Sequence, residues 1–351
     1  MRIMLTSTYG WPEVYRGGER YVHELAGSLH EAGHDVRVVM SGPGPARDTV
    51  RGVPVIRLRP REFPRYGELG REVAFGVAAL AAVGWRRMDV WHATSTADAA
   101  AAATLGRVRD IRTVFTDHGF PLAASRERRA DYRLYRMILR HIDTYVSVSY
   151  AAADCLSNVF HRRATVVHPG VDTELFQPAR RSEVPTIVYA GSLTESRKGL
   201  PLLASAVRLL RRSMPALRFE VYGQGTPPAE VAAVADVCAV LDPHALAERY
   251  AGAWATVLPS KAEPFGMVLT ESLAAGTPVV ALRDGSGPRD IVRPGVGALS
   301  GNSPGELAEA CHRVLDLARD PNTAVACRRH AMTFDWRTAI VPQFERVYAG
   351  D

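Results

Sequence analysis

The alternation of strand and helix patterns in both halves of the chain constrains its fold more than any other feature. In residues 1–180 the expected strands are 2–7, 35–40, 53–58, 89–92, 113–116, 144–148 and 165–167, and the expected helices are 18–32, 68–84, 97–106, 125–141 and 149–160. In residues 181–351 the expected strands are 186–190, 217–222, 237–241, 256–258 and 279–281, and the expected helices are 199–212, 245–251, 266–275 and 304–318. This alternation is typical of parallel sheets with helices on both faces. We therefore predict an α/β fold of two doubly wound, Rossmann-like domains.

The domain boundary is expected in the polar stretch Gln177–Pro185, which lies between two prolines and lacks periodicity. With 351 residues and 47% apolar content, the chain is long enough to bury two cores. We predict a first domain at 1–180, a second at 181–333, and a C-terminal amphipathic helix in 334–351 that packs back on the first domain. Two such domains facing each other would enclose a cleft at the carboxyl ends of their strands.

Composition favours a cytoplasmic protein. No stretch approaches the roughly 18 apolar residues of a membrane-spanning helix, and residues 1–10 lack the apolar core of a signal peptide. The four cysteines have no metal-ligand spacing, so we interpret them as reduced thiols. The net charge of +6 is modest, and no recognised nucleic-acid module is present, so we expect no nucleic-acid partner.

The segment EPFGMVLTE, from Glu263 to Glu271, is the most informative local motif. A short buried strand precedes it, and a helical pattern follows it up to Gly276. Glu263 should therefore lie in a strand-to-helix loop, with Glu271 inside the helix. Helical spacing would bring the two carboxylates to nearly the same face, roughly 12 Å apart along the axis. The helix N-terminus between them offers backbone amides to an anion.

Two further strand ends in the second half carry features of an anion site. After the strand ending at Ala190, Gly191 is followed by Arg197 and Lys198 at the start of a helix. Adjacent cations at a helix N-terminus can clamp a diphosphate, although solvated loop cations are the alternative interpretation. The next strand ends in a turn at Gly223, where a ligand could approach the backbone.

The first half contributes candidate residues at two strand ends. Gly17 and Gly18 follow the first strand and open a helix, so their amides can approach a phosphate; a flexible turn is the alternative. His118 lies just past the strand 113–116, and Asp117 before it is expected to orient it. A nicotinamide-dependent oxidoreductase is disfavoured, because no GxGxxG opens a helix in this chain.

These motifs, in this order, resemble the retaining GT-B glycosyltransferases of glycosyltransferase family 4, also called glycosyl transferases group 1. The resemblance covers nearly the whole chain. The matching segments are Arg16–Glu19, Ala32–Val36, Thr116–Gly119, His168–Asp172, Phe176–Pro178, the pair Glu263 and Glu271 in the EPFG context, and Leu273–Val280. One departure is Ser192, where many members have an arginine after the glycine, which leaves Arg16 as a candidate for the second cation of the clamp.

The resemblance implies roles for individual residues. Arg197 and Lys198 would neutralise the diphosphate of a nucleotide-sugar donor, Glu271 would hold the ribose hydroxyls, and Glu263 would bind the transferred sugar. The other implied donor contacts are Gly17, Gly18, Arg16, Gly191, Gly223 and the backbone amides of Phe265, Gly266, Met267 and Val268. His118 would act at the reacting sugar. The expected catalytic set is thus His118, Glu263, Arg197 and Lys198.

The implied reaction transfers a hexose-type sugar with retention of anomeric configuration. Cations and helix dipoles can stabilise the leaving group without a metal, and the chain has no Asp-x-Asp, so we expect neither metal nor cofactor. The donor would be a UDP- or GDP-linked sugar. A front-face route is expected, in which the departing phosphate takes the acceptor's proton, so we name no protein base.

The acceptor is left open among a lipid phosphate, a saccharide and a small molecule. Residues 125–141 combine six arginines with apolar residues and could form a basic helix that contacts the inner face of the membrane. A solvated face is the alternative. Two other functions stay open at this point: a sugar-nucleotide epimerase or hydrolase on the same fold, and a catalytically silent subunit that binds a sugar nucleotide.

Overall fold

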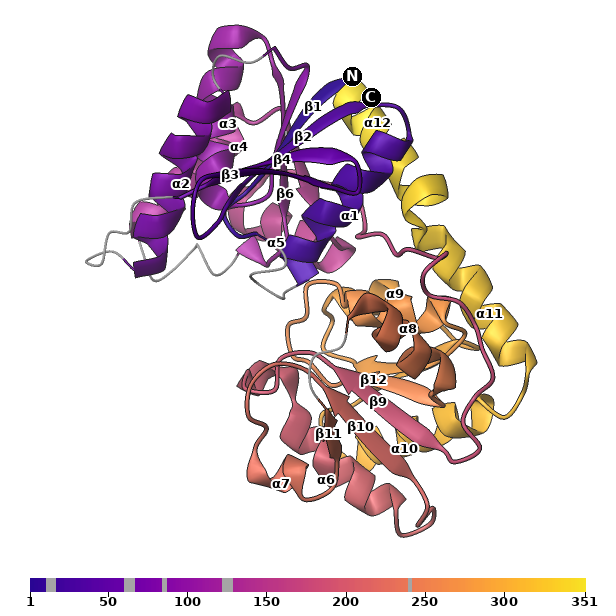
Figure 1. Ribbon diagram of the computed structural model, residues 1–351. Helices are drawn as coiled ribbons and strands as arrows, with labels where there is room; N and C mark the ends of the chain where they lie inside the picture. The colour runs from indigo at the N-terminus through magenta and orange to yellow at the C-terminus, as the bar shows by residue number, and fades with distance from the viewer. Residues whose placement is uncertain (11–16, 60–66, 84–86, 122–128, 239–241) are drawn as a thin grey trace. The chain divides into compact units, whose positions relative to one another are not determined.

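The computed structural model describes residues 1–10, 17–59, 67–83, 87–121, 129–238 and 242–351 (Figure 1). It divides the chain into two compact units. Unit 1 comprises Met1–Gly170 and Trp336–Asp351, and unit 2 comprises Val171–Asp335. Arg16, and the residues before Arg129 in the predicted basic helix, lie outside the described residues. No helix in the described residues combines the length and apolarity needed to cross a bilayer.

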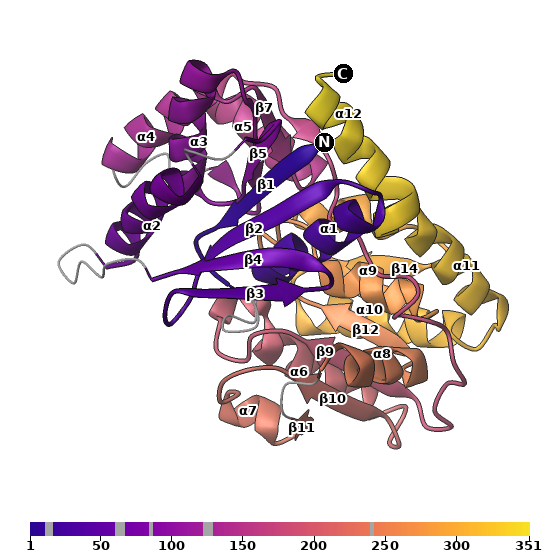
Figure 2. The same ribbon diagram turned by 45° about the horizontal axis from the view of Figure 1, so that its top comes forward.

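Unit 1 contains an eight-stranded sheet in the order β3-β4-β2-β1-β5-β6-β7-β8. Its strands are β1 (Arg2–Ser7), β2 (Asp35–Ser41), β3 (Ala46–Val50), β4 (Val53–Leu58), β5 (Val90–Ala93), β6 (Arg112–Asp117), β7 (Thr144–Ser147) and β8 (Thr165–Val166). All pairs are parallel except β3 with β4, an antiparallel edge hairpin that we did not predict (Figure 2). The β3 sequence ARDTV is polar and mostly exposed, so it has no strand-like hydrophobic pattern.

Helices cover both faces of this sheet, because successive strand residues point to opposite sides. Ile3, Leu5 and Val114 pack in one core, whereas Met4 and Phe115 pack in the other. The first core also receives α1 (Gly17–Glu31) and the C-terminal segment. The second receives α2 (Gly67–Val83), α3 (Thr96–Arg109), α4 (Arg129–His141) and α5 (Tyr150–Phe160).

Unit 2 contains a six-stranded, fully parallel sheet in the order β11-β10-β9-β12-β13-β14. Its strands are β9 (Thr186–Ala190), β10 (Arg218–Tyr222), β11 (Asp236–Cys238), β12 (Ala255–Leu258), β13 (Val279–Leu282) and β14 (Gly297–Ser300). The strand order reverses between β9 and β12, as in doubly wound nucleotide-binding sheets. Sequence analysis missed β14, because this strand is short and its residues are small and mostly only partly buried.

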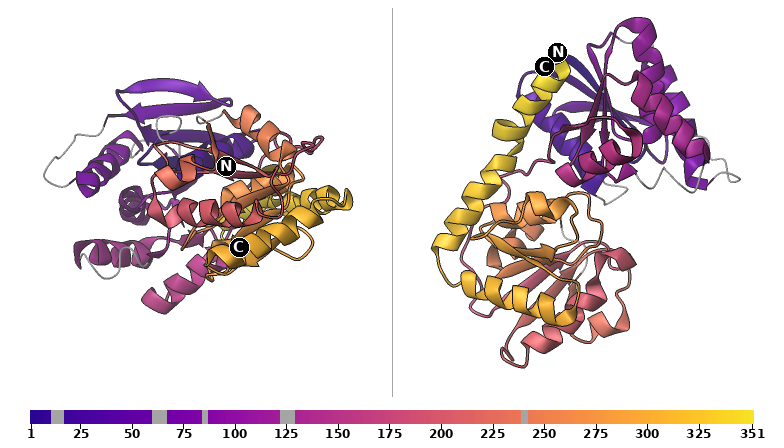
Figure 3. Two further views of the ribbon diagram at one scale, coloured as in Figure 1. Left: turned by 90° about the horizontal axis from the view of Figure 1, so that it is seen from below. Right: turned by 180° about the vertical axis from the view of Figure 1, so that it is seen from behind.

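The helices of unit 2 are α6 (Leu200–Leu210), α7 (Ala229–Ala232), α8 (Pro243–Gly252), α9 (Met267–Ala274), α10 (Pro304–Leu317) and α11 (Asn322–Ala331). Side chains from α6, α7 and α10 form one core with the sheet. Figure 3 shows the ribbon of unit 2 from two further sides. The α9 helix contacts α8 and α11 on the other side. The predicted boundaries are close for α6, α8, α9 and α10, whereas α11 was not predicted.

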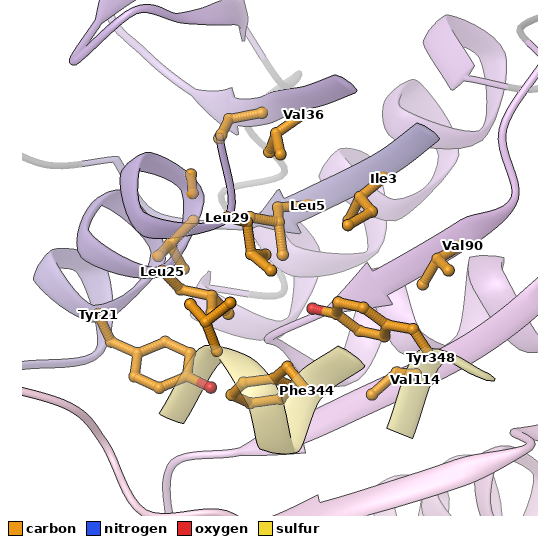
Figure 4. Close-up of a cluster of buried hydrophobic side chains, with 14 of the residues drawn as sticks. Ile3, Leu5, Tyr21, Leu25, Leu29, Val36, Val90, Val114, Phe344 and Tyr348 are labelled. Atoms are coloured by element: carbon orange, nitrogen blue, oxygen red, sulfur yellow. The ribbon is translucent and has the colours of Figure 1, made fainter. Parts of the chain in front are cut away.

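The C-terminal segment completes the core of unit 1. It comprises a π-helical turn (Trp336–Ile340) and α12 (Val341–Ala349). Trp336, Phe344 and Tyr348 are buried against α1 and the sheet, and Figure 4 shows Phe344 and Tyr348 in the same cluster as Tyr21. The sequence prediction of a C-terminal helix that returns to the first domain is confirmed.

The division between the units lies at Gly170/Val171, ten residues before the predicted boundary at 180/181. Residues 171–181 bond to unit 2. Val171 donates its amide to Phe334, and the Thr173 hydroxyl donates to Asp335 Oδ2 at 2.6 Å. Arg181 bonds the carbonyl of Gly276 at 3.0 Å. Arg181, in the stretch where the boundary was predicted, is therefore hydrogen-bonded within unit 2.

Candidate active site

The loops after β9 and β12 meet at the point where the strand order of unit 2 reverses. Because both strands are parallel neighbours, their carboxyl ends lie at one edge of the sheet. The β9 loop leads to a 3₁₀ turn, Ser196–Lys198, and the β12 loop leads to Glu263. Ligands bind at such switch points in open α/β sheets. The topology therefore brings together the predicted cations and the first predicted carboxylate.

Lys198 and Glu263 form an ion pair within this edge. Lys198 Nζ lies 2.8 Å from Glu263 Oε2, and the two side chains are only 15% and 11% exposed. Arg197 is 46% exposed, lies 3.5 Å from the same oxygen, and pairs with Glu195 at 2.9 Å. Lys198 is thus held by Glu263, whereas the more exposed Arg197 lies between the carboxylates of Glu195 and Glu263.

Close backbone packing fixes these cations. Gly199 has φ +69°, and a Cβ there would overlap the carbonyl oxygen of Pro259. Lys261 donates its amide to the carbonyl of Arg197 at 2.8 Å. Only glycine fits at position 199. The 3₁₀ turn and the β12 loop are therefore held together by close backbone packing and by the Lys261–Arg197 hydrogen bond.

The predicted glycines Gly191 and Gly223 also contact each other. A Cβ on Gly223 would overlap the carbonyl oxygen of Gly191, and Gly191 donates to the Tyr222 carbonyl at 2.9 Å. Leu193 donates to the Gln224 carbonyl at 3.0 Å. The ends of β9 and β10 are therefore joined backbone to backbone, which leaves a surface without side chains at these two positions.

The EPFG segment differs from its predicted geometry in one respect. The α9 helix begins at Met267, and Gly266 before it has φ +99°, so Glu263 lies outside the helix. Glu263 thus lies in the strand-to-helix loop and Glu271 within the helix, as predicted, and helical periodicity does not extend back to Glu263. Glu271 is 1% exposed within α9. Met267 and Val268 form the first turn, whose amides have no partner within the helix.

Phe265 has a structural role besides its predicted amide contact. Its side chain is 3% exposed and packs edge-on against Phe334 at 5.8 Å between ring centroids. This contact holds the EPFG loop on the body of unit 2.

In unit 1, the structure brings His118 next to the start of α1. The His118 ring lies beside Gly18, which together with Gly17 forms the first turn of that helix. Tyr21 packs edge-on against His118 at 4.5 Å, and Trp336 packs edge-on against Tyr21 at 5.3 Å. His118 Nε2 is buried without a hydrogen-bond partner in the described part of the chain, whereas most buried polar side-chain atoms in proteins are paired.

Asp117 shapes the histidine loop through hydrogen bonds of its own. Its carboxylate accepts the Gly119 amide and the Tyr145 hydroxyl, each at 2.8 Å, and the Tyr135 hydroxyl. Asp117 therefore fixes the loop that carries His118, and within the described residues its hydrogen bonds run to these three groups.

Burial lowers the pKa of His118 to about 4, with Asp117 opposing this effect. Burial, and then the neighbouring charge on His118, lower the pKa of His92 to about 3. His92 lies between the Tyr348 hydroxyl at 2.8 Å and the Thr116 hydroxyl at 2.7 Å. His118 is thus neutral at pH 7 and can donate or accept a hydrogen bond.

We expect acid to destabilise unit 1 through His118. Because its folded pKa lies below the ordinary value of 6.5, the unfolded chain binds a proton that the folded chain rejects as the pH falls from 6.5 towards 4. The free energy of unfolding should fall by up to about 2 kcal/mol between pH 6.5 and about 5. Denaturant titrations of the parent chain and His118→Gln, compared at each pH, isolate this contribution. Parallel stability profiles would contradict it.

The predicted basic helix is only partly described, as α4 from Arg129 to His141. Tyr135, Ile138 and Leu139 are buried in the core of unit 1. Arg133, Arg136 and Arg140 are exposed. The apolar face of this helix is therefore used in packing, and Arg133, Arg136 and Arg140 lie on its exposed side.

Comparisons with known proteins agree with this geometry. Residues 15–175 match the family model described as Glycosyltransferase Family 4, and residues 184–317 match the model described as Glycosyl transferases group 1. Glycogen synthase of Mycobacterium tuberculosis is 30% identical over 96% of this chain and 92% of its own length. The chain belongs to glycosyltransferase family 4.

Other members and structures are similar to this family 4 glycosyltransferase. D-inositol 3-phosphate glycosyltransferase of Geodermatophilus obscurus is 31% identical over 74% of this chain and 62% of its own length. Sucrose-phosphate synthase of Thermosynechococcus elongatus has TM-score 0.85 at 21% identity, over 99% and 98% of the two chains. Anabaena HepE, solved with UDP and glucose, has TM-score 0.76 at 16% identity over 99% of each chain. The fold is GT-B.

Sequence reasoning missed several residues next to the candidate site residues of each unit of this glycosyltransferase. Tyr21 and Trp336 pack behind His118, and Asp284 bonds the loop before Glu263. The segment DGSGP at Asp284 has a sequence signal, since aspartate followed by glycine and serine after a strand is typical of an Asx turn. The aromatic contacts join residues 21, 118 and 336, and no local spacing indicates them.

Proposed function

We propose that this family 4 glycosyltransferase moves a hexose-type sugar from a nucleoside-diphosphate donor to an acceptor hydroxyl. The observation that carries the proposal is the buried ion pair between Lys198 and Glu263, with Arg197 beside it, at the switch point of unit 2. Cations at this point suit a diphosphate, and a carboxylate suits sugar hydroxyls.

Each residue has a role in this proposal. Arg197 and Lys198 stabilise the charge that develops on the departing diphosphate, which is an electrostatic form of catalysis. Glu263 accepts hydrogen bonds from the transferred sugar, and its contact with Lys198 orients it. Glu271 holds the ribose, and the first amides of α9 meet phosphate or sugar oxygens.

His118 acts at the sugar as a neutral imidazole. Its pKa of about 4 excludes protonation at pH 7, so it contributes a hydrogen bond and not a positive charge. Gly17 and Gly18 at the start of α1 bring amides to the same region of unit 1. His118→Ala should therefore lower turnover and spare nucleotide affinity.

The proposed chemistry retains configuration and needs no metal. The bond from the anomeric carbon to the phosphate oxygen breaks, and that oxygen takes the proton of the acceptor hydroxyl on the same face of the sugar. The acceptor oxygen then bonds the anomeric carbon. Arg197 and Lys198 supply the positive charge that the leaving group needs.

Solved GT-B structures support the donor class. HepE was solved with UDP and with UDP-glucose, and starch synthase IV of Arabidopsis thaliana with ADP and acarbose. We propose a UDP- or GDP-linked donor for this chain. The acceptor is a saccharide, a small molecule or a lipid phosphate, and contact with a membrane would use the exposed arginines of α4.

A thermal-shift panel tests the donor proposal. The protein is melted with UDP, GDP, ADP, dTDP or CDP, in buffer with a chelator and without added metal. A nucleotide at about 100 times its dissociation constant stabilises the folded state by about 2.7 kcal/mol, which raises the melting temperature measurably. We expect a rise with one base. No rise with any of the five nucleotides would contradict the proposal and favour a chain that lacks donor binding.

A further inference from the structure

Ala262, the residue before Glu263, has an unusual backbone conformation. Its φ of +48° lies in the left-handed region, which residues with a Cβ other than asparagine and aspartate rarely adopt. Strained residues of this kind persist only where the surrounding structure holds them, and they concentrate at functional sites. Ala262 therefore needs contacts with its surroundings that hold it in this conformation.

Asp284, just after β13, holds Ala262 by a direct hydrogen bond. Its Oδ2 accepts the Ala262 amide at 2.7 Å. Its Oδ1 accepts the Ser286 amide at 3.0 Å and the Ser286 hydroxyl. Both carboxylate oxygens are thus used, one on the EPFG loop and the other on the turn that carries Asp284 itself.

A second contact joins the same two loops on the other side of Glu263. Gly287 donates its amide to the carbonyl of Glu263 at 2.8 Å, and a Cβ on Gly287 would overlap the carbonyl oxygen of Pro264. The loop of residues 283–287 therefore contacts the backbone at 262, 263 and 264, by hydrogen bonds at the first two and by close packing at the third. The backbone is thus hydrogen-bonded to this loop at Ala262 and at Glu263.

We infer that Asp284 is a positioning residue for Glu263, and that it acts through the strained backbone of Ala262. A carboxylate suits this task, because it accepts strong charge-assisted hydrogen bonds from several donors at once. Asp284 orients the Glu263 side chain towards Lys198 and, on the proposed function, towards the sugar. It has no direct contact with substrate in this scheme.

Kinetics of Asp284→Ala test the inference against a merely structural role. We expect kcat/KM for the nucleotide sugar to fall at least about tenfold, while the dissociation constant of the bare nucleotide stays within about threefold. Asp320→Ala is the matched control, since Asp320 also accepts a backbone amide in unit 2, that of Asn322 at 2.9 Å, far along the chain from this loop. Equal kcat/KM in Asp284→Ala and the parent would overturn the inference.

A rescue experiment addresses the strain directly. Glycine adopts positive φ without the Cβ penalty, so Ala262→Gly should partly restore kcat/KM when it is combined with Asp284→Ala. Asp284→Asn, which keeps one acceptor oxygen, should lie between Asp284→Ala and the parent. Failure of both variants to exceed Asp284→Ala would contradict positioning through the Ala262 backbone.

Hydrogen exchange gives a readout that needs no substrate. Amides in residues 260–266 should exchange faster in Asp284→Ala than in the parent and in Asp320→Ala. Unchanged exchange would overturn the inference, whatever the nucleotide panel shows. Faster exchange in a protein that binds no nucleotide would support the Asp284 contact and contradict only the donor proposal.

Discussion

The Glu263→Gln variant is expected to transfer sugar about a hundredfold more slowly than the parent chain, because it loses a charged hydrogen-bonding group. The change keeps the size of the side chain and removes its charge. It leaves Lys198, whose side chain is 15% exposed, without the carboxylate that lies 2.8 Å from its ammonium group. Steady-state kinetics with the nucleotide sugar identified by the thermal-shift panel measure the loss.

Glu271→Gln is the matched comparison, since the same chemical change is made eight residues away. On the proposed roles, Glu271→Gln weakens binding of the bare nucleotide, whereas Glu263→Gln leaves that affinity within about threefold of the parent. Calorimetric titration with the nucleoside diphosphate separates the two. If both variants weakened nucleotide binding equally, the division into a sugar carboxylate and a ribose carboxylate would be wrong.

Trp336→Ala is expected to reduce the stability of unit 1 by about 3–5 kcal/mol. The indole is 2% exposed, lies directly against Gly170, and packs on Tyr21. Its Nε1 donates to Glu24 Oε2 at 2.8 Å, and Glu24 would be left buried with one bond fewer. Thermal melting and hydrogen exchange of α1 measure the effect.

Two controls sharpen this result. Trp336→Phe keeps an aromatic ring and removes only the N–H, so it should cost clearly less than alanine. Trp254→Ala removes an indole from unit 2, where its Nε1 bonds the Ser182 carbonyl at 2.8 Å, and should leave hydrogen exchange in α1 unchanged. An unchanged melting profile for Trp336→Ala would show that the aromatic stack with Tyr21 and His118 contributes little.

Most of the fold could be predicted from hydrophobic patterning, because buried parallel strands are short apolar runs with clear ends. β4 and β9 were predicted to the residue. β3 was missed because it pairs with the neighbouring strand β4 but packs little of its own surface into a core, so it carries no hydrophobic pattern. α11 was missed because NTAVACRRHA mixes small and basic residues, and its buried face is set by contacts with α9.

The candidate site also has parts that could be predicted from the sequence and parts that could not. Glycines, cations and carboxylates at strand ends could be predicted, since their chemistry is visible in one short segment. The Lys198–Glu263 pair joins residues 65 positions apart, and only the strand order of unit 2 brings them together. The DGSGP segment predicts a turn at Asp284, but the bond from Asp284 to the Ala262 amide has no sequence signature. The role of Asp284 follows from the geometry of the two loops.

The discontinuity of unit 1 has a consequence for biosynthesis. Unit 2 is one continuous stretch, whereas the core of unit 1 lacks Trp336, Phe344 and Tyr348 until residues 336–351 have been made. A nascent chain therefore exposes the apolar face of α1 and its sheet while residues 171–335 are being translated. Unit 2 can finish folding on the ribosome before unit 1, which reverses the usual N-terminal-first order. Unit 1 is thus the part of this enzyme that depends on protection from aggregation during synthesis.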